Sequence, residues 1–539
     1  MNITELTLTI PRQPFERMFA WISRHALVLV LIFLAIISVV SYVHFYQNGL
    51  GLAYNDARSH LDIGRRVVEG LKPGLAQLGS VWLPLPHILM IPMIWNDFMW
   101  HSGLAGALQS MTSFVATGAV IYMFLRMLGV GLLGRVFGVV VFFLNLNVLY
   151  LQSIAMTELL LFFTMTAGVY ELTKWHKTDN ILALIRAAFW VMLSTLIRYD
   201  GWFLLAYCAG LIVFHIWKKR GYRAAEGYFI LFCTLGSFGI FLWLLWNQLI
   251  FKDALYFAFG PFSAHAQQAQ LETAGVLMTK KNLLLSLKIY LYAMVFNSTA
   301  YVTILAVVGA VVLWFDKRIN PAVRLSTSAL CAPFLFNILA LYLGHSVLFV
   351  QGISGNTWFN VRYGATMIPS LAIFMGYLID RVKIGRLSLI ALYAFVIFFS
   401  VANNDAVTID DARVGSSQKN VSEVSGYLKT HAANEEGFIL ISAASHDAII
   451  FSSELPMKRF IHEGTGSYWE SATTSPDRWA RWIVMRTHDD NDLTYKAIRV
   501  TNQLSKYTMV AKFPFADVYE LKSEYLSTLN TEPTLPKQK

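Results

Sequence analysis

Long apolar runs repeat along this chain, and they restrict its possible fold more than any other feature. Each run is about twenty residues, long enough to cross a hydrocarbon core of roughly 30 Å as a helix. The chain of 539 residues is 56% hydrophobic and only 14% charged, which is too little charge to cover a soluble protein of this size. We therefore expect a polytopic α-helical membrane protein with about eleven transmembrane helices. The expected spans are 27–45, 103–126, 132–150, 157–174, 181–198, 202–217, 226–250, 286–314, 323–344, 361–379 and 387–402.

Basic residues occur in alternate loops between these runs. Arg12, Arg17 and Arg24 precede the first run, which predicts a cytoplasmic N-terminus over residues 1–26. Every second loop of the expected membrane domain (27–402) is also basic, as cytoplasmic loops are. The basic residues of these loops are Arg126, Arg135, Lys174, Lys177, Lys218, Lys219, Arg220, Arg223, Lys317, Arg318, Arg324, Arg381, Lys383 and Arg386.

The first loop on the other side, residues 46–102, is large and polar. It includes an apolar stretch at 83–95, LPLPHILMIPMIW, which has three prolines and is too short to cross a bilayer. We expect this stretch to re-enter the membrane or to lie along its surface. If it did cross, every basic loop would move outside, against the positive-inside rule.

The apolar runs stop at about residue 403. Strand-like segments at 437–442, 482–486, 507–513 and 517–521 then alternate with helix-like segments at 476–482 and 492–499. This alternation predicts a small α/β extracytoplasmic domain over 403–528, followed by a disordered tail at 529–539.

Net charge differs between these two parts of the chain. The first 402 residues have 28 Lys and Arg against 15 Asp and Glu, whereas the rest has 15 against 18. A basic membrane domain indicates contact with anionic membrane lipids, and nucleic acid is the weaker interpretation.

Five ionisable residues are expected at the outer ends of spans or in outer loops. Because charged groups near a bilayer are costly, each is expected to line a wet cavity or to pair with a partner. The structural alternative is that such residues cap helices or extend to the interface. Five on one side favour a shared site. They are Asp56, Glu158, Arg198, Asp200 and Arg362.

Asp56 lies at the start of a helix-like segment in the first outer loop. Either Asn55 or Asp56 is suited to cap this helix, and a cap at Asn55 leaves the Asp56 carboxylate free to act as a general base. His60, one turn later, is placed to orient Asp56 or an acceptor, although such a histidine is more often a packing residue.

The two outer arginines are phosphate candidates, because a guanidinium matches phosphate geometry. Arg362, in NTWFNVRYG beside Asn360 and Tyr363, is the stronger one because no carboxylate lies near it in sequence. Arg198, in RYDGW, either pairs only with Asp200 or binds a phosphate. Glu158, in MTELL, is placed to bond a sugar or to balance an arginine.

Motifs of several other enzyme classes are absent from the sequence. There is no Walker loop, GxSxG, HExxH or CxxC, which argues against nucleotide, serine-hydrolase or zinc-hydrolase chemistry. No metal site follows from spacing. The carboxylates of Asp56, Glu158 and Asp200 would suit Mg²⁺ or Mn²⁺ if they converged.

With these residues placed, the chain resembles the GT-C-fold glycosyltransferases, similar to the protein O-mannosyltransferase and lipid A aminoarabinose transferase superfamily (family-39-like). The resemblance covers about residues 20–400 in topology. It is most specific in YNDARSHLDIGRRVVEGLKPGLAQLGSVWLPLPH, MTELL and RYDGW. One departure is that Ala57 follows Asp56, where many relatives have a second acid.

The resemblance implies an inverting hexosyl or pentosyl transferase with a polyprenyl-phosphate sugar donor and Asp56 as catalytic base. It also implies location in a bacterial inner membrane. The acceptor, whether protein, lipid or glycan, is left open. A transporter or flippase of a lipid-linked glycan is the alternative, although the one-sided charge is less typical of an alternating-access site. A non-catalytic scaffold would leave Asp56, Arg198 and Arg362 without a role.

Overall fold

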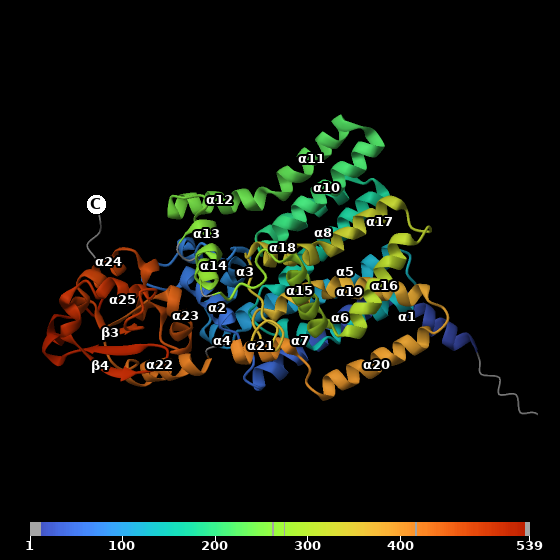
Figure 1. Ribbon diagram of the computed structural model, residues 1–539. Coiled ribbons are helices and arrows are strands. Elements are labelled where there is room, and N and C mark those ends of the chain that lie inside the picture. Colours follow the sequence, from blue (N-terminus) through green and yellow to red (C-terminus); the bar gives the residue numbers. More distant parts are fainter. Residues whose placement is uncertain (1–11, 261–262, 274, 416–417, 534–539) are drawn as a thin grey trace, which may run out of the picture.

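The computed structural model describes residues 12–260, 263–273, 275–415 and 418–533 (Figure 1). A bundle of helices forms the larger part of the molecule. A smaller domain around a β-sheet lies at one end of it, and helix α1 begins at the opposite end (Figure 1). The predicted fold class, a helical membrane protein with a small C-terminal α/β domain, is confirmed.

The helical part follows the apolar runs, with several helices interrupted. Its main helices are α1 (Arg12–Gln47), α5 (Leu104–Met127), α6 (Leu132–Phe143), α7 (Leu146–Leu151), α8 (Glu158–Thr178), α9 (Ile181–Thr195), α10 (Asp200–Arg220), α11 (Tyr222–Gly236), α12 (Phe238–Phe251), α15 (Leu283–Ser298), α16 (Ala300–Phe315), α17 (Pro321–Thr327), α18 (Ala332–Leu343), α19 (Ile368–Arg381) and α20 (Arg386–Ala402). Short helices connect them: α13 (Tyr256–Phe259), α14 (Ala264–Thr273) and the 3₁₀ helices η2 (Ser328–Cys331) and η3 (Val361–Met367).

Five helices among the described residues are long and apolar enough to cross a membrane, or up to seven if each of two bent pairs is one span. The five are Ala20–Gln47, Leu104–Met127, Asp200–Arg220, Pro321–Leu343 and Arg386–Val414. The expected count of about eleven therefore stays a prediction. The run 286–314, expected as one span, bends by 109° between α15 and α16. Thr299 at this bend has φ +73° and accepts a hydrogen bond from the backbone N–H of Val302, so its side chain starts the second helix.

The first large loop folds into a short helical layer. Its elements are α2 (Asn55–Val68), η1 (Leu75–Leu78), α3 (Leu85–Ile94) and α4 (Asp97–His101). Helix α3 is only ten residues long and has Pro92 inside it, as the expectation of a non-crossing stretch requires. Asn55 is already in the first turn of α2, with Tyr54 extended at the cap position, so the prediction that Asn55 caps this helix is wrong.

Helix α2 is buried although it is polar. It packs on α3 and on α23 (Ala443–Ser452) of the C-terminal part, and most of its side chains are buried between them. A polar helix enclosed in this way needs partners for its charged side chains.

The C-terminal domain is built on a five-stranded sheet in the order β2-β1-β3-β5-β4. Strands β1 (Phe438–Ile441), β2 (Phe460–Ile461) and β3 (Ala480–Met485) are parallel, whereas β4 (Tyr507–Lys512) and β5 (Asp517–Leu521) add antiparallel pairs. The remaining elements are α21 (Val407–Gly415), α22 (Gln418–His431), η4 (Met457–Arg459), η5 (Glu463–Thr465), α24 (Ser467–Thr474), η6 (Pro476–Arg478), α25 (Leu493–Ile498), η7 (Asn502–Lys506) and η8 (Ser523–Thr528).

The four strand-like segments all form strands, but the segment 476–482 was predicted wrongly as a helix. Only a short 3₁₀ turn forms there, and the chain enters β3 at Ala480, because its buried side chains continue the sheet core. Of the tail expected to be disordered, Leu529 packs on the sheet cluster and the N–H of Asn530 donates to the Arg478 carbonyl. Residues 534–539 lie outside the described residues.

Candidate active site

A chain of ion pairs joins residues from four distant elements. The Asp56 Oδ2 atom accepts a hydrogen bond from Nη2 of Arg362 at 2.6 Å. Nε of Arg362 donates to Oε1 of Glu158 at 3.0 Å, and Nη1 of Arg198 donates to the same oxygen at 3.2 Å. Nε of Arg198 then donates to Asp200 Oδ2 at 3.3 Å. Asp56 and Arg362 are 306 residues apart in sequence, so only the tertiary fold joins them.

Exposure differs sharply along this network. The side chains of Glu158, Asp200 and Arg362 are 0%, 2% and 7% exposed, whereas that of Asp56 is 40% exposed. Buried charges are tolerated only when they are paired and hydrogen-bonded. The buried members therefore hold each other in place, and Asp56 is the end that an incoming molecule can reach.

Each of these three carboxylates lies in the first turn of a helix. Asp56 is in the first turn of α2, Glu158 begins α8 and Asp200 begins α10. Helix N-termini carry a partial positive charge that stabilises nearby anions. The three helix ends and the two guanidinium groups together place positive charge beside these carboxylates in a largely buried part of the molecule.

Aromatic rings support the two arginines. The Tyr363 ring lies 4.7 Å from the Arg198 guanidinium carbon and 5.4 Å from that of Arg362. The Tyr54 ring lies 5.0 Å from the Arg362 guanidinium on another side. Such cation–π contacts orient a guanidinium plane without using its N–H donors. Asn360 is placed elsewhere, because its Nδ2 donates to the Val347 carbonyl at 3.0 Å.

Two expectations about the arginines need correction. Arg362 was preferred because no carboxylate is near it in sequence, but the fold gives it Asp56 and Glu158 as partners. Arg198 does not pair with Asp200 alone, since it also contacts Glu158. Two roles were expected for Glu158, bonding a sugar or balancing an arginine. In this structure it balances two arginines.

His60 is joined to a second histidine instead of Asp56. His60 Nδ1 lies 2.8 Å from Nε2 of His87, and the His60 ring lies 4.3 Å from the Trp82 ring. Burial, together with the positive charges of Arg362 and Arg198, lowers the pKa of His60 to about 3. His60 is therefore a neutral hydrogen-bonding group beside the ion pairs at physiological pH.

Sequence reasoning missed two residues that the structure places beside the site. Asp411, from α21, has Oδ2 4.0 Å from Nη1 of Arg362 and accepts a hydrogen bond from the Tyr54 hydroxyl at 3.1 Å. His87 contacts His60 from α3. Nothing local in the sequence singles out Asp411, because it lies in an ordinary polar stretch about 350 residues after Asp56.

The same carboxylates do not form a metal cage. Among the described residues, no group of three or more His, Cys, Asp or Glu side chains is arranged to hold a metal ion. Asp56, Glu158 and Asp200 each contact a guanidinium instead.

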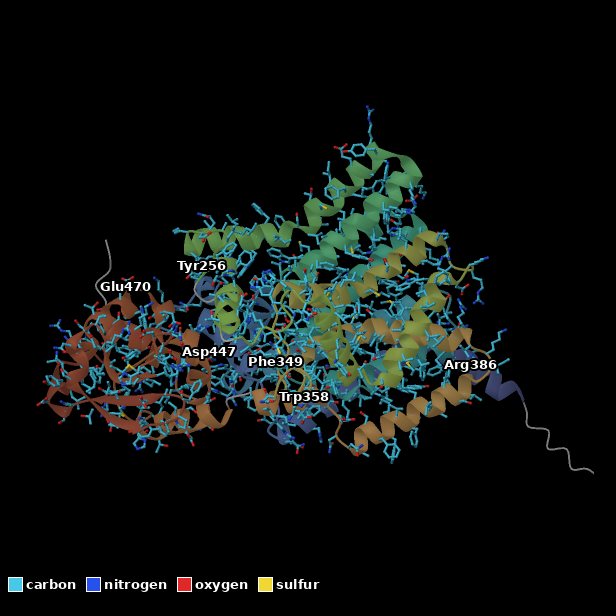
Figure 2. All side chains as sticks on the ribbon, in the orientation of Figure 1. Tyr256, Phe349, Trp358, Arg386, Asp447 and Glu470 are labelled. Carbon is cyan, nitrogen blue, oxygen red and sulfur yellow. The ribbon has the colours of Figure 1, made fainter. Side chains whose placement is uncertain are left out.

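The C-terminal domain covers the α2 side of this site. Asp447 of α23 is partly buried there, hydrogen-bonds Ser59 and lies near Arg66, and Figure 2 shows it at the border with the helical part. Glu463 accepts hydrogen bonds from the N–H groups of Ala443 and Ala444, which caps the start of α23.

No protein-family model and no curated protein matches this chain. Solved structures do match over most of its length, and the chain has the GT-C fold, the fold of a class of integral-membrane glycosyltransferases. The expected fold is thereby confirmed.

Among the similar structures is ArnT from Cupriavidus metallidurans, in crystal structures bound to undecaprenyl phosphate and in the apo state. The bound structure superposes with a TM-score of 0.55 at 11% identity, covering 93% of this chain and 99% of that one. The apo structure gives 0.53 at 12% identity with the same coverage. The oligosaccharyltransferase of Archaeoglobus fulgidus is less similar, with a TM-score of 0.49 at 12% identity over 94% of this chain and 75% of that one.

Proposed function

We propose that this chain is a glycosyltransferase that moves a hexose or pentose from a polyprenyl-phosphate donor to an acceptor on the extracytoplasmic face of a membrane. The observation that carries the proposal is the accessible Asp56 carboxylate held 2.6 Å from the buried guanidinium of Arg362. The fold adds support, because the similar ArnT structure was solved with undecaprenyl phosphate.

The donor phosphate would bind Arg362, with Arg198 behind it. A phosphate oxygen would compete with the Asp56 carboxylate for the same Nη2 donor of Arg362. A guanidinium can form paired hydrogen bonds with a phosphate as it does with a carboxylate. Donor binding would release Asp56 towards the acceptor. Glu158 would keep Arg362 and Arg198 oriented, because its Oε1 accepts from both.

Transfer then needs one proton movement and one substitution. The acceptor hydroxyl attacks the anomeric carbon, its proton goes to Asp56, and the bond from that carbon to the phosphate oxygen breaks. Polyprenyl phosphate leaves with the bonding electron pair, and the guanidinium groups stabilise its developing charge. Attack from the face opposite the phosphate inverts the anomeric centre.

A divalent cation is outside this mechanism and stays a prediction. It would require Asp56, Glu158 and Asp200 to leave their arginine partners and converge. Measuring transfer with EDTA, and again after adding Mg²⁺ or Mn²⁺, tests that requirement directly.

The proposed function is tested with the purified full-length chain in liposomes. The assay supplies radiolabelled polyprenyl-phosphate sugars and, as acceptors, envelope lipids and glycans from cells that lack the protein. The expected result is a new glycosidic bond, seen as label in acceptor material and as free polyprenyl phosphate by mass spectrometry. Movement of labelled lipid across the bilayer with no glycosidic bond formed would instead establish a flippase.

A further inference from the structure

A polar cavity lies between α2 and the C-terminal domain, apart from the ion pairs. Its volume is about 410 Å³, within the range of roughly 300–1,000 Å³ that is usual for small-molecule sites. Helix α2 supplies Arg58, and α22 supplies Ser422, Ser425, Gly426 and Lys429. The end of α23 and the turn after it supply Ser452 and Glu454.

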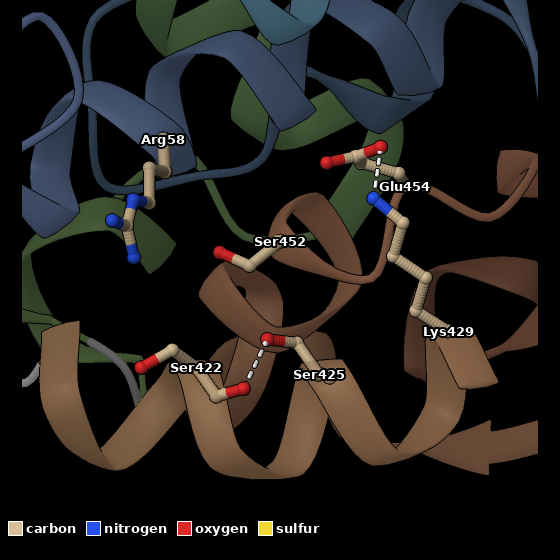
Figure 3. A pocket seen from close by; sticks show the side chains of 7 residues that line it. Arg58, Ser422, Ser425, Lys429, Ser452 and Glu454 are labelled. Atoms are coloured by element: carbon tan, nitrogen blue, oxygen red, sulfur yellow. Dashed lines mark hydrogen bonds and ion pairs between the residues drawn. The ribbon is translucent and has the colours of Figure 1, made fainter. Parts of the chain in front are cut away.

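Arg58 is the unusual member of this lining. It is only 5% exposed, yet among the described residues it makes no ion pair, and its one hydrogen bond runs from Nε to the Leu52 carbonyl at 3.0 Å. Arg362, which is similarly buried, contacts three carboxylates. A buried guanidinium without an ion-pair partner is costly, and burial lowers the pKa of Arg58, although the charge of Asp62, one turn further along α2, acts in the opposite direction. Figure 3 shows its guanidinium pointing from α2 into the space that the three serines border.

The rest of the lining narrows the ligand chemistry. Lys429 Nζ lies 2.5 Å from Glu454 Oε2, so these two charges cancel. Arg58 therefore gives the lining of the cavity a net charge of +1. Serine side chains border the same walls, and the Ser425 hydroxyl, which donates to the Val421 carbonyl at 2.8 Å, can still accept from a ligand hydroxyl. An oxyanion attached to a hydroxyl-rich group matches both features.

We propose that this cavity is a binding site for an anionic saccharide, such as a sugar phosphate or an acidic sugar, whose oxyanion pairs with Arg58. Asp56 and Arg58 are two residues apart on α2 and therefore point to opposite sides of the helix. The site is thus separate from the Asp56–Arg362 pair. It does not depend on whether the chain transfers a sugar.

Gly426 offers a way to fill the cavity without disturbing the fold. A Cβ added there would meet no atom within 4 Å, and its φ is not positive, so the helix accepts a side chain. Gly426→Trp places an indole in the cavity. Glu423→Trp is the matched control, because Glu423 is exposed on the same helix and does not line the cavity.

The test titrates detergent-purified full-length protein with glucose 1-phosphate, glucuronate and uncharged glucose by calorimetry. Wild type and Glu423→Trp are expected to bind one or both anions at least about tenfold more tightly than glucose, the effect of one charge-assisted hydrogen bond. The preferred anion identifies the oxyanion as phosphate or carboxylate. Gly426→Trp should lose that binding.

Equal binding of the anion by Gly426→Trp and wild type would overturn the proposal, because the anion would then be bound elsewhere. No preference for either anion over glucose in wild type would overturn it as well. Arg58→Gln gives a second readout if Gly426→Trp does not fold. Its amide can still donate to the Leu52 carbonyl, but it should lose the anion preference while glucose binding is unchanged.

Discussion

At the scale of single residues, the three carboxylates of the site differ in how far their side chains are exposed. Glu158 and Asp200 are fully enclosed and act on the arginines, whereas Asp56 is the only carboxylate of the three with substantial exposure. This difference, and not the residue type, separates a candidate base from structural acids. Two substitutions test that separation.

Asp56→Asn should abolish transfer while the protein stays folded. The amide oxygen can still accept from Arg362, but it cannot take a proton, so the rate should fall by roughly 10²–10⁴-fold. Turnover of labelled donor and the thermal unfolding midpoint are measured together. Asp253→Asn, in the exposed loop before α13, is the control, because Asp253 lies outside the ion-pair network. Near-normal turnover in Asp56→Asn would remove Asp56 as the base.

Arg362→Lys should raise the KM for the lipid donor by roughly tenfold or more. Lysine keeps the charge that Glu158 needs, but it cannot bond a phosphate and two carboxylates in one plane. Arg381→Lys is a suitable comparison, since Arg381 also makes two ion pairs, with Asp316 and Asp380, in another part of the molecule. An unchanged donor KM in Arg362→Lys would argue against a phosphate at this guanidinium.

At the scale of elements, close packing of short segments holds these charges in position. The 3₁₀ helix η3 carries Arg362 and Tyr363 and packs against α15 through Gly364. A Cβ on Gly364 would overlap the backbone carbonyl of Ala293, which has no room to move. The close contact between η3 and α15 therefore fixes the position of the Arg362 guanidinium.

Gly364→Ala should lower both stability and transfer. Overpacking of this kind costs about 1–3 kcal/mol and would push η3 away from α15, moving Arg362 from Asp56. The measurements are the thermal midpoint and donor turnover. Gly210→Ala in α10 is the control, because a Cβ there meets no atom within 4 Å and should leave both values unchanged or slightly raised. Full activity in Gly364→Ala would show that η3 tolerates displacement.

At the scale of the whole molecule, α2 is the element that both parts share. Its side chains reach the ion pairs, the cavity of Figure 3 and α23 of the C-terminal domain. The contact includes two acids, Asp62 on α2 and Asp447 on α23. Burial raises the pKa of both carboxyl groups, and the charge of Asp447 raises the pKa of Asp62 further.

These raised pKa values predict that the contact weakens as pH rises. A carboxyl group whose folded-state pKa is raised binds its proton more tightly in the folded chain. Its stabilisation is complete below the ordinary value near 3.8 and is lost as pH rises through the folded-state pKa. The thermal midpoint should therefore fall over that window in wild type.

Asp447→Asn should reduce this fall, because it removes one acid and relieves its repulsion of the other. Midpoints measured from pH 4 to 8 in wild type and variant compare the slopes. Asp253→Asn, in the exposed loop before α13, controls for an overall change in net charge. Parallel curves for wild type and Asp447→Asn would show that the contact does not titrate.

Much of the architecture follows from the sequence alone. The apolar runs determine a helical membrane part because a helix is the only way to satisfy the backbone of such a segment in lipid. Four of the five strands were predicted from their β-branched and aromatic residues, and only the two-residue β2 was not. Broken helices such as α15 and α16 were not predicted, because hydropathy does not register a change of direction.

The charged residues that need partners could likewise be recognised in the sequence: Asp56, Glu158, Arg198, Asp200 and Arg362. It did not determine their partners, because a charge is recognisable locally whereas an ion pair depends on how distant helices cross. Folding brings Arg362 to Asp56 across 306 residues, places Asp411 and His87 beside them, and buries Arg58 with no ion pair to any residue that the structure describes. This is because the hydrophobic pattern can be read from each segment by itself, whereas an ion pair forms only between segments that pack together.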